Sequence, residues 1–182
     1  MTDSDPTLSD AALRGSYPRP PWLARVMNEK MGSRNGPDWT LALHQRIYRA
    51  TGGRLGHGLI GLPTLLLTVP GRRTGTPRTV GLVYARDGGM FVVSSGVAAT
   101  TGREPAWIGN VRAHPQVSLQ VWRDHVTACA RVLDATDPEY ATRWARIVAL
   151  NPERFEGYRA AAGKPLPIVT LEPVARRVPP ED

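Results

Sequence analysis

The C-terminal two thirds of the chain contain short segments whose apolar positions predict strands. In 79–86, Val80, Leu82 and Tyr84 occupy every second position, which is the period that a pleated strand imposes. Other segments are continuous apolar runs of strand length, such as the run from Leu65 to Leu67. The predicted strands are 64–69, 79–86, 90–95, 116–122, 125–133 and 167–172.

Most of these strands are joined by short turns. Asp87-Gly88-Gly89 and Arg123-Asp124 are typical of hairpin links, which connect antiparallel neighbours. Six strands of this length are enough to curl into a small barrel, and closure removes exposed sheet edges. We therefore predict a mainly β fold with a mostly antiparallel sheet and flanking helices.

Apolar residues at helical spacing interrupt the strands. After Asp137 and Pro138, which suit the start of a helix, Tyr140, Trp144 and Ile147 form one apolar stripe. The predicted helices are 39–50, 105–113, 138–150 and 152–162, with a further short one around 22–30.

The segment 39–50 combines an apolar face with basic residues on the opposite side. The apolar face runs from Trp39 to Ala50 and needs a covering surface, for which packing on the domain is the favoured interpretation. Arg46 and Arg49 on the polar side would also suit anionic lipid. Peripheral contact with the inner face of the membrane therefore stays open.

Composition bounds the domain organisation. A chain of 182 residues with 41% hydrophobic residues is long enough for one domain with a sizeable core. Residues 1–36 mix Pro, Gly, Asp, Ser and Arg with little periodicity, so we expect a partly disordered N-terminal extension. The expected domain is 37–174, and 175–182 form a C-terminal tail.

The chain is basic, with a formal charge of +7. All but two of its 23 basic residues are arginines, a bias that a GC-rich genome would also produce, so overall basicity is weak evidence for an anionic partner. We find no recognition helix and no aromatic face interleaved with Lys and Arg. We therefore expect a small-molecule partner and no nucleic acid.

Cysteine and histidine usage argues against metal or disulfide chemistry. Cys129 is the single cysteine, and we interpret it as a small core residue in a protein of a reducing compartment. The four histidines have no ligand spacing, so we predict no metal site. The longest apolar stretch, 59–69, is too short to span a membrane and the N-terminus lacks a signal-peptide pattern, so we expect a cytoplasmic protein.

The turn between the first two predicted strands concentrates the candidate chemistry. Arg72, Arg73 and Arg78 lie in it, and their forked donors match phosphate or carboxylate. Gly71 and Gly75 can take left-handed backbone angles or let a ligand approach the backbone. An anion clamp and a solvent-exposed basic turn are about equally compatible with these residues.

Two further segments carry candidate binding groups. Pro105 opens a helix whose first-turn N–H groups would accept an anion, with Trp107 as a flat apolar surface and Asn110 as a bidentate amide. An ordinary connector whose tryptophan fills the core is the alternative. Phe155 and Tyr158 stand at helical spacing, where they either cover the mouth of the barrel or pack in the core.

The ordered set of these motifs resembles the deazaflavin-dependent nitroreductase family over about residues 38–174. The matching pieces are Leu65-Leu66-Leu67-Thr68, Gly71-Arg72-Arg73-Thr74-Gly75-Thr76-Pro77-Arg78, Asp87-Gly88-Gly89, Pro105-Ala106-Trp107 with Asn110, and Pro167-Ile168-Val169. The resemblance implies a split β-barrel that binds coenzyme F420, a deazaflavin with a phospholactyl-polyglutamate tail. It also implies hydride transfer from the reduced cofactor to a quinone, an activated alkene or a nitro-type acceptor.

Positions that match the family's cofactor contacts follow from the same resemblance. They are Arg72, Arg73, Thr74, Arg78, Thr79, Val80, Gly81, Leu82, Val83, Ser94, Ser95, Gly96, Val97, Ala106, Trp107, Ile108, Gly109, Asn110 and Phe155. Asn151 and Phe155 stand where nitroreducing members carry tyrosines, which leaves Tyr158 as the matching hydroxyl. We expect Tyr158 to be the catalytic proton donor.

Other functions remain open at this point. A split-barrel enzyme that uses FMN would hold a single phosphate, and a non-catalytic deazaflavin carrier would bind the cofactor but oxidise nothing. A basic module that binds nucleic acid or membrane is the alternative from a different class.

Overall fold

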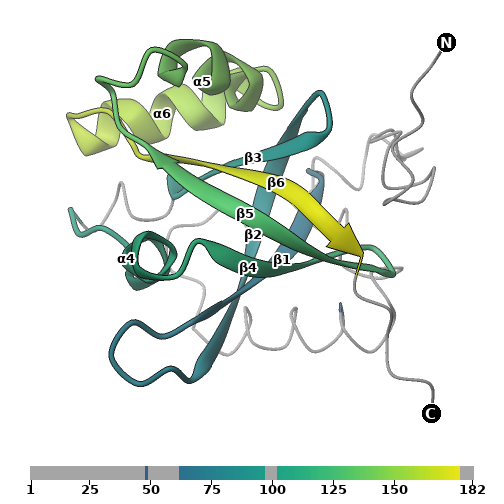
Figure 1. Cartoon of the computed structure of the whole chain (residues 1–182). Coiled ribbons are helices and arrows are strands. Elements are labelled where there is room, and N and C mark those ends of the chain that lie inside the picture. The colour runs from purple at the N-terminus through teal and green to yellow at the C-terminus, as the bar shows by residue number, and fades with distance from the viewer. Residues whose placement is uncertain (1–47, 49–61, 97–101, 177–182) are drawn as a thin grey trace, which may run out of the picture.

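The computed structural model describes Tyr48, residues 62–96 and residues 102–176 (Figure 1). Its elements in chain order are β1 (Thr64–Pro70), β2 (Pro77–Asp87), β3 (Met90–Ser94), α4 (Ala106–Ala113), β4 (Gln116–Val121), β5 (Asp124–Leu133), α5 (Tyr140–Val148), α6 (Pro152–Ala162) and β6 (Ile168–Arg176). Every strand predicted from the sequence is present, and so are the three helices predicted after residue 100. The expected extension 1–36, nearly all of the helix 39–50, Val97 and residues 177–182 lie outside the described residues.

The six strands close into an antiparallel barrel in the order β1-β2-β3-β6-β5-β4. β1 pairs with β2 on one side and closes the barrel with β4 on the other, where Leu67 faces Leu119. β6 enters between β3 and β5, with Val169 opposite Val93 and Leu171 opposite Ala130. The predicted mainly β split barrel with flanking helices is confirmed.

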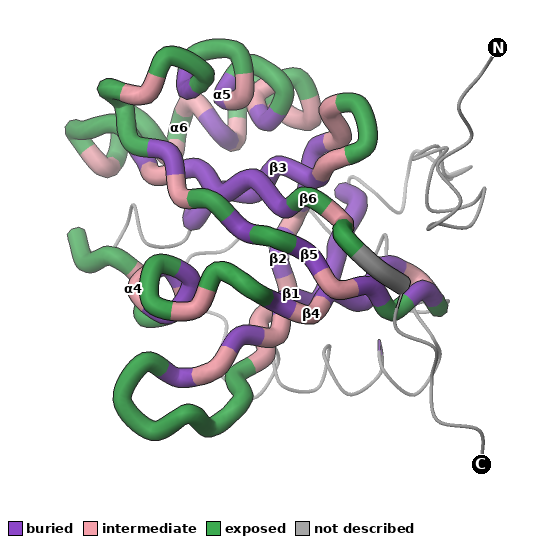
Figure 2. Tube along the Cα trace, viewed as in Figure 1, coloured by how far each residue is buried: buried purple, intermediate pink, exposed green. Residues whose placement is uncertain are grey.

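Alternation along the strands divides the apolar residues between two cores. Leu82, Tyr84, Phe91 and Val93 belong to the core inside the barrel, with Tyr84 and Phe91 in edge-to-face contact at 5.1 Å between ring centroids. The intervening residues Ala85 and Val92 belong to a second core outside it, together with residues of α5 and α6. Figures 1 and 2 show these two helices as a layer over one face of the barrel, with their buried sides turned toward β3.

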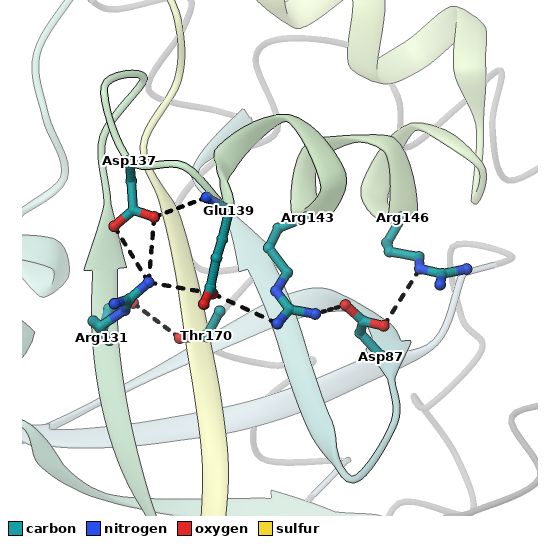
Figure 3. A network of polar contacts seen from close by, with 7 residues as sticks. All are labelled: Asp87, Arg131, Asp137, Glu139, Arg143, Arg146 and Thr170. Atoms are coloured by element: carbon teal, nitrogen blue, oxygen red, sulfur yellow. Dashed lines mark hydrogen bonds and ion pairs between the residues drawn. The ribbon is translucent and has the colours of Figure 1, made fainter.

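Ion pairs fix α5 to the strands beneath it (Figure 3). Arg143 of α5 pairs with Asp87 at the end of β2 and, at 3.5 Å, with Glu139. Arg131 of β5 lies 3.2 Å from both Glu139 and Asp137. Because the Arg143 and Asp87 side chains are only 17% and 13% exposed, this pair is screened by solvent far less than a surface pair.

The structure corrects three details of the sequence interpretation. Cys129 is exposed, not a core residue, because the alternation of β5 directs Ala128 and Ala130 inward and Cys129 outward. α5 begins at Tyr140 and not at Pro138, because the Asp137 carboxylate accepts the Glu139 N–H at 3.0 Å in a turn before the helix. β6 continues past residue 172 to Arg176, with a register shift opposite Thr127 and Ala128 that accommodates Pro173.

Tyr48 bonds to β1 and to the turn after β4. It is helical, and its side chain is fully buried. Its hydroxyl donates to the Thr64 carbonyl at 3.0 Å and accepts the Trp122 N–H at 2.9 Å. Trp122 has a φ of 57°, a left-handed value that is unusual for a residue with a side chain. The hydrogen bond from its N–H therefore holds a strained hairpin turn in place.

Candidate functional site

An open groove lies between the β1–β2 turn and α4, which Figure 1 shows on the same side of the barrel. Its volume is about 410 Å³. It is lined by Gly71, Arg72, Arg73, Thr74, Arg78, Thr79, Val80, Ala106, Trp107 and Asn110, and we call these residues the arginine groove. None of them is acidic, so three guanidinium groups face a cavity without a carboxylate to neutralise them.

The β1–β2 turn has a defined backbone structure although it is exposed (Figure 2). Gly75 donates its N–H to the Gly71 carbonyl at 2.7 Å, and Gly71 donates to the Thr76 carbonyl at 2.9 Å. Gly75 has a φ of 67°, which a residue with a side chain rarely adopts. Below the turn, the hydroxyls of Thr68 and Thr79 are 2.8 Å apart across β1 and β2. The arginines are therefore carried by a turn whose path is fixed.

Contacts with α4 hold the same turn from its other side. The Arg72 N–H donates to Oδ1 of Asn110 at 3.1 Å, and Asn110 is only 7% exposed. The Arg72 guanidinium lies over Gly109, where a Cβ atom would come within 2.0 Å of Nη1. Gly109 therefore leaves the space that the Arg72 side chain occupies.

The N-terminus of α4 adds backbone donors to the groove. Pro105 precedes the first turn in an extended conformation, no side chain caps the helix, and no acidic residue lies in that turn. The first N–H groups of a helix have no carbonyl partner within it, and the helix dipole makes this end attractive to anions. Ile108 is fully buried and its N–H bonds to the Pro105 carbonyl, so its neighbours Ala106 and Trp107 are better placed to face a ligand.

A second cluster lies where β3 ends beneath α6, and we call Gly96, Arg154, Phe155 and Tyr158 the α6 cluster. The Tyr158 ring packs on the backbone of Gly96, so closely that a Cβ atom there would be 2.5 Å from two ring carbons. Phe155 is buried and meets Tyr158 edge to face at 6.1 Å between centroids. The Tyr158 hydroxyl accepts a hydrogen bond from Nε of Arg154 at 3.1 Å.

The predicted site residues divide between these two places. Those of the turn and of α4 line the arginine groove, except for Ile108 and Gly109. Ser94, Ser95 and Gly96 lie at the end of β3, where Gly96 contacts Tyr158 and the Ser94 hydroxyl donates to the Pro167 carbonyl at 3.1 Å, whereas Val97 is outside the described residues.

β2 joins the two places. Thr79 lines the groove, and four residues further along Val83 packs with Tyr158 against the outer core. Leu82 points into the barrel core. A ligand lying along β2 would therefore meet the face that carries Thr79, Gly81 and Val83.

Sequence reasoning missed Arg154, and of the two roles it offered for Gly71 the structure shows a place in the groove and no left-handed backbone. Arg154 stands four residues before Tyr158, and this spacing on a predicted helix was the signal that could have identified the pair. Gly71 is buried and lines the groove, where it bonds to Thr76 and Gly75. The part of the chain that the structure describes contains no cluster of His, Cys, Asp and Glu able to hold a metal ion, and no helix long and apolar enough to cross a membrane.

Comparisons with known proteins agree with this geometry. The family model of the F420H(2)-dependent quinone reductases matches residues 39–173. An F420H(2)-dependent quinone reductase of Mycobacterium tuberculosis is 38% identical over 134 residues, which cover 72% of this chain and 88% of the relative.

Solved structures show the same fold. An F420-H2 dependent reductase is 26% identical, with a TM-score of 0.52 over 60% of this chain and 94% of that one. A structure described as a domain-swapped dimer is also 26% identical, with a TM-score of 0.54 over 74% of this chain and 98% of its own. The deazaflavin family and the cofactor predicted from the sequence, coenzyme F420, are thereby confirmed. The chain belongs to the family of F420H(2)-dependent quinone reductases.

Proposed function

We propose that this enzyme reduces a quinone, holding the tail of coenzyme F420 in the arginine groove and the acceptor beside the α6 cluster. When bound in its reduced form, the deazaflavin supplies a hydride, that is, two electrons and one proton. The protein supplies binding, orientation and a second proton. The observation that carries the proposal is the arginine groove, because three arginines without an acidic neighbour suit an anionic tail better than an apolar ligand.

The donor set of the groove fits a phosphate followed by carboxylates. Arg72, Arg73 and Arg78 offer forked donors at separate points of the turn, so that successive anionic groups can each find a partner. The N-terminus of α4 offers backbone N–H groups, which suit a phosphate. Trp107 adds an apolar surface to the same groove. A single phosphate, as in FMN, would use only part of this set.

The α6 cluster has the properties of an acceptor site. A quinone becomes a hydroquinone by accepting a hydride and a proton, so the site needs an apolar surface and a proton donor. Phe155 provides an aromatic surface and Tyr158 a hydroxyl at the same end of the barrel. Tyr158 would give its proton to the acceptor oxygen and be protonated again from solvent. We also propose that residues 37–174 form the catalytic domain.

Titration and turnover together test the proposal. We expect coenzyme F420 to bind more tightly than FMN when each is titrated into the purified protein and followed by fluorescence. With reduced F420, a panel of a naphthoquinone, an activated alkene and a nitroaromatic compound identifies the acceptor by return of the oxidised cofactor's absorbance. Equal affinity for FMN would contradict the cofactor assignment. Tight F420 binding without oxidation by any acceptor would identify a carrier, and oxidation by the alkene or the nitro compound alone would replace the quinone.

A further inference from the structure

We propose that Arg154 stabilises the oxyanion that forms on the acceptor during reduction, while it holds the Tyr158 hydroxyl in position. The inference rests on the proposed quinone reduction and deepens it by naming the group that faces the developing negative charge.

One guanidinium nitrogen of Arg154 is hydrogen-bonded, and another is buried without a hydrogen-bond partner among the described residues. Its Nε donates to the Tyr158 hydroxyl at 3.1 Å. Its Nη1 is buried and has no hydrogen-bond acceptor among the described residues. A buried charged donor without an acceptor is costly, which makes such groups rare unless a ligand or water completes them. A negatively charged oxygen at Nη1 would remove that cost.

The arginines near Arg154 differ from it in having carboxylate partners. Arg159, five residues further along α6, pairs with Glu156 at 2.7 Å. Arg143 of α5 pairs with Asp87. Among the described residues Arg154 takes part in no ion pair. Its backbone N–H donates to the Asn151 side chain, and the hydrogen bond of its guanidinium is to the Tyr158 hydroxyl. Its positive charge is therefore available to a ligand in a way that its neighbours' charges are not.

The same end of the barrel contains a second unpartnered polar group. Ser95 is 4% exposed, and its hydroxyl has no hydrogen-bond partner among the described residues. Ser95 precedes Gly96, the residue on which the Tyr158 ring packs. Both unpartnered groups therefore belong to residues next to the contact between Gly96 and Tyr158, Arg154 through its hydrogen bond to Tyr158 and Ser95 as the residue before Gly96.

The chemistry of quinone reduction needs a positive group at this place. Addition of a hydride to a quinone gives a hydroquinone monoanion, with the added charge on a carbonyl oxygen. The Tyr158 O–H bond then breaks, an O–H bond forms on that oxygen, and the Tyr158 oxygen carries the charge until solvent protonates it. Arg154 keeps its own proton throughout. It would stabilise first the acceptor oxyanion through Nη1 and then the phenolate through Nε.

Binding of a matched pair of ligands in the absence of cofactor separates this role from a merely structural one. The probes are 1,4-naphthoquinone, which is neutral, and 2-hydroxy-1,4-naphthoquinone, which is an anion at neutral pH. Binding is followed by quenching of tryptophan fluorescence. For Arg154→Gln we expect about tenfold or greater loss of affinity for the anion and less than about twofold loss for the neutral quinone, since hydrogen bonds to charged groups are worth about 1.5–3 kcal/mol.

Control variants test whether the loss of affinity for the anion comes from Arg154. Arg154→Lys keeps the charge and should retain most of the affinity for the anion, whereas Arg159→Gln, on the exposed side of α6, should leave both affinities unchanged. Arg78→Gln tests whether the anion binds in the arginine groove instead. Loss of anion affinity in Arg78→Gln but not in Arg154→Gln overturns the proposal. Equal loss for both probes in Arg154→Gln also overturns it, because the arginine would then only brace Tyr158.

Turnover supplies the second readout. In Arg154→Gln we expect kcat for a quinone to fall by about 10²-fold, the typical effect of removing one oxyanion donor, with a smaller change in KM. Unchanged kcat would contradict the proposal. A parent protein that reduces no quinone would refute the proposed function, yet the two-probe binding comparison would still decide the charge preference of Arg154.

Discussion

The backbone N–H of Arg72 donates a hydrogen bond to the side-chain oxygen of Asn110, 38 positions later in the chain. This bond joins the β1–β2 turn to α4, and thereby the two segments that line the arginine groove. The Asn110 side chain therefore helps to fix the shape of the groove, in addition to the sheet that carries the turn. We therefore expect Asn110 to affect ligand binding through the position of the turn.

Replacing Asn110 separates this positioning role from simple contact with the cofactor. Asn110→Ala leaves the Arg72 N–H without its acceptor, and we expect a loss of about 1 kcal/mol in unfolding free energy and a several-fold loss of F420 affinity. Asn110→Asp keeps the acceptor but adds a negative charge to the groove. It should therefore weaken F420 binding with little effect on the melting temperature. Isothermal titration and thermal denaturation of both variants test this, and unchanged F420 affinity in Asn110→Ala would exclude the positioning role.

Arg78→Ala should weaken F420 binding by about tenfold or more, because a charge-assisted hydrogen bond to an anion is worth about 1.5–3 kcal/mol. The matched control is Arg123→Ala, since Arg123 is an exposed arginine in the β4–β5 turn, outside the groove. The difference between the two variants should shrink as salt is added. Fluorescence titrations at low and high salt measure it, and equal affinities at low salt would show that the turn is not the anion clamp.

Gly109→Ala should raise stability and lower F420 affinity at the same time. Alanine is favoured over glycine inside a helix by about 0.5–1 kcal/mol. The new Cβ atom would displace the Arg72 guanidinium, which is the flexible end of its side chain, so the protein accommodates it by moving Arg72. Gly157→Ala in α6, where a Cβ atom would meet nothing within 4 Å, should raise the melting temperature without changing the affinity. An unchanged F420 affinity in Gly109→Ala would show that the resting position of Arg72 is irrelevant to binding.

Tyr158→Phe keeps the packing on Gly96 and removes the hydroxyl. If Tyr158 donates the proton, turnover should fall by about 10²-fold or more, with little change in F420 affinity or melting temperature. Steady-state kinetics over the acceptor panel and an F420 titration measure both quantities. Full turnover with every acceptor that works would assign the proton to solvent.

The stability of the protein should fall at alkaline pH in part because of Tyr140. Burial raises the pKa of its phenol above the ordinary value of about 10, and the hydroxyl donates to the Leu166 carbonyl at 2.8 Å. The folded state therefore keeps this proton at a pH where the unfolded chain has lost it, so stability is full below pH 10 and declines above it. In Tyr140→Phe, the decline above about pH 10 should be shallower than in the parent. Urea unfolding at a series of pH values tests this, and identical slopes would contradict it.

Local sequence patterns were sufficient for the elements and for the chemical character of the groove. The alternation of apolar residues in β2 predicted that Leu82 and Tyr84 lie on the buried face of the strand. They do, because that face packs inside the barrel. The glycines and arginines of the turn predicted that basic side chains gather there, and the structure places Arg72, Arg73 and Arg78 around one groove; that the groove binds an anion stays a prediction. The patterns that predict structure are those in which a residue's environment depends on its immediate neighbours.

Contacts between distant segments could not be predicted in this way. The packing of Arg72 on Gly109 and of Tyr158 on Gly96 depends on how α4 and α6 are placed against the strands, which no short window of sequence records. Arg154 was missed because only the structure shows that its guanidinium bonds to Tyr158 and not to Glu153 or Glu156 of the same helix. Cys129 was misjudged because its size was weighed without the alternation of its own strand.

The two hydrogen bonds of the Tyr48 hydroxyl have a kinetic consequence. Its partners, Thr64 and Trp122, belong to β1 and to the turn after β4, two strands that lie side by side only when the first and fourth strands have paired. Contacts of such long sequence separation form late and slow the search for the native state. Both hydrogen bonds of Tyr48 can therefore form only after β1 and β4 have paired, and the Trp122 amide proton becomes a probe of that pairing. In a pulse-labelling hydrogen-exchange experiment it should gain protection after the amides of the β1–β2 hairpin.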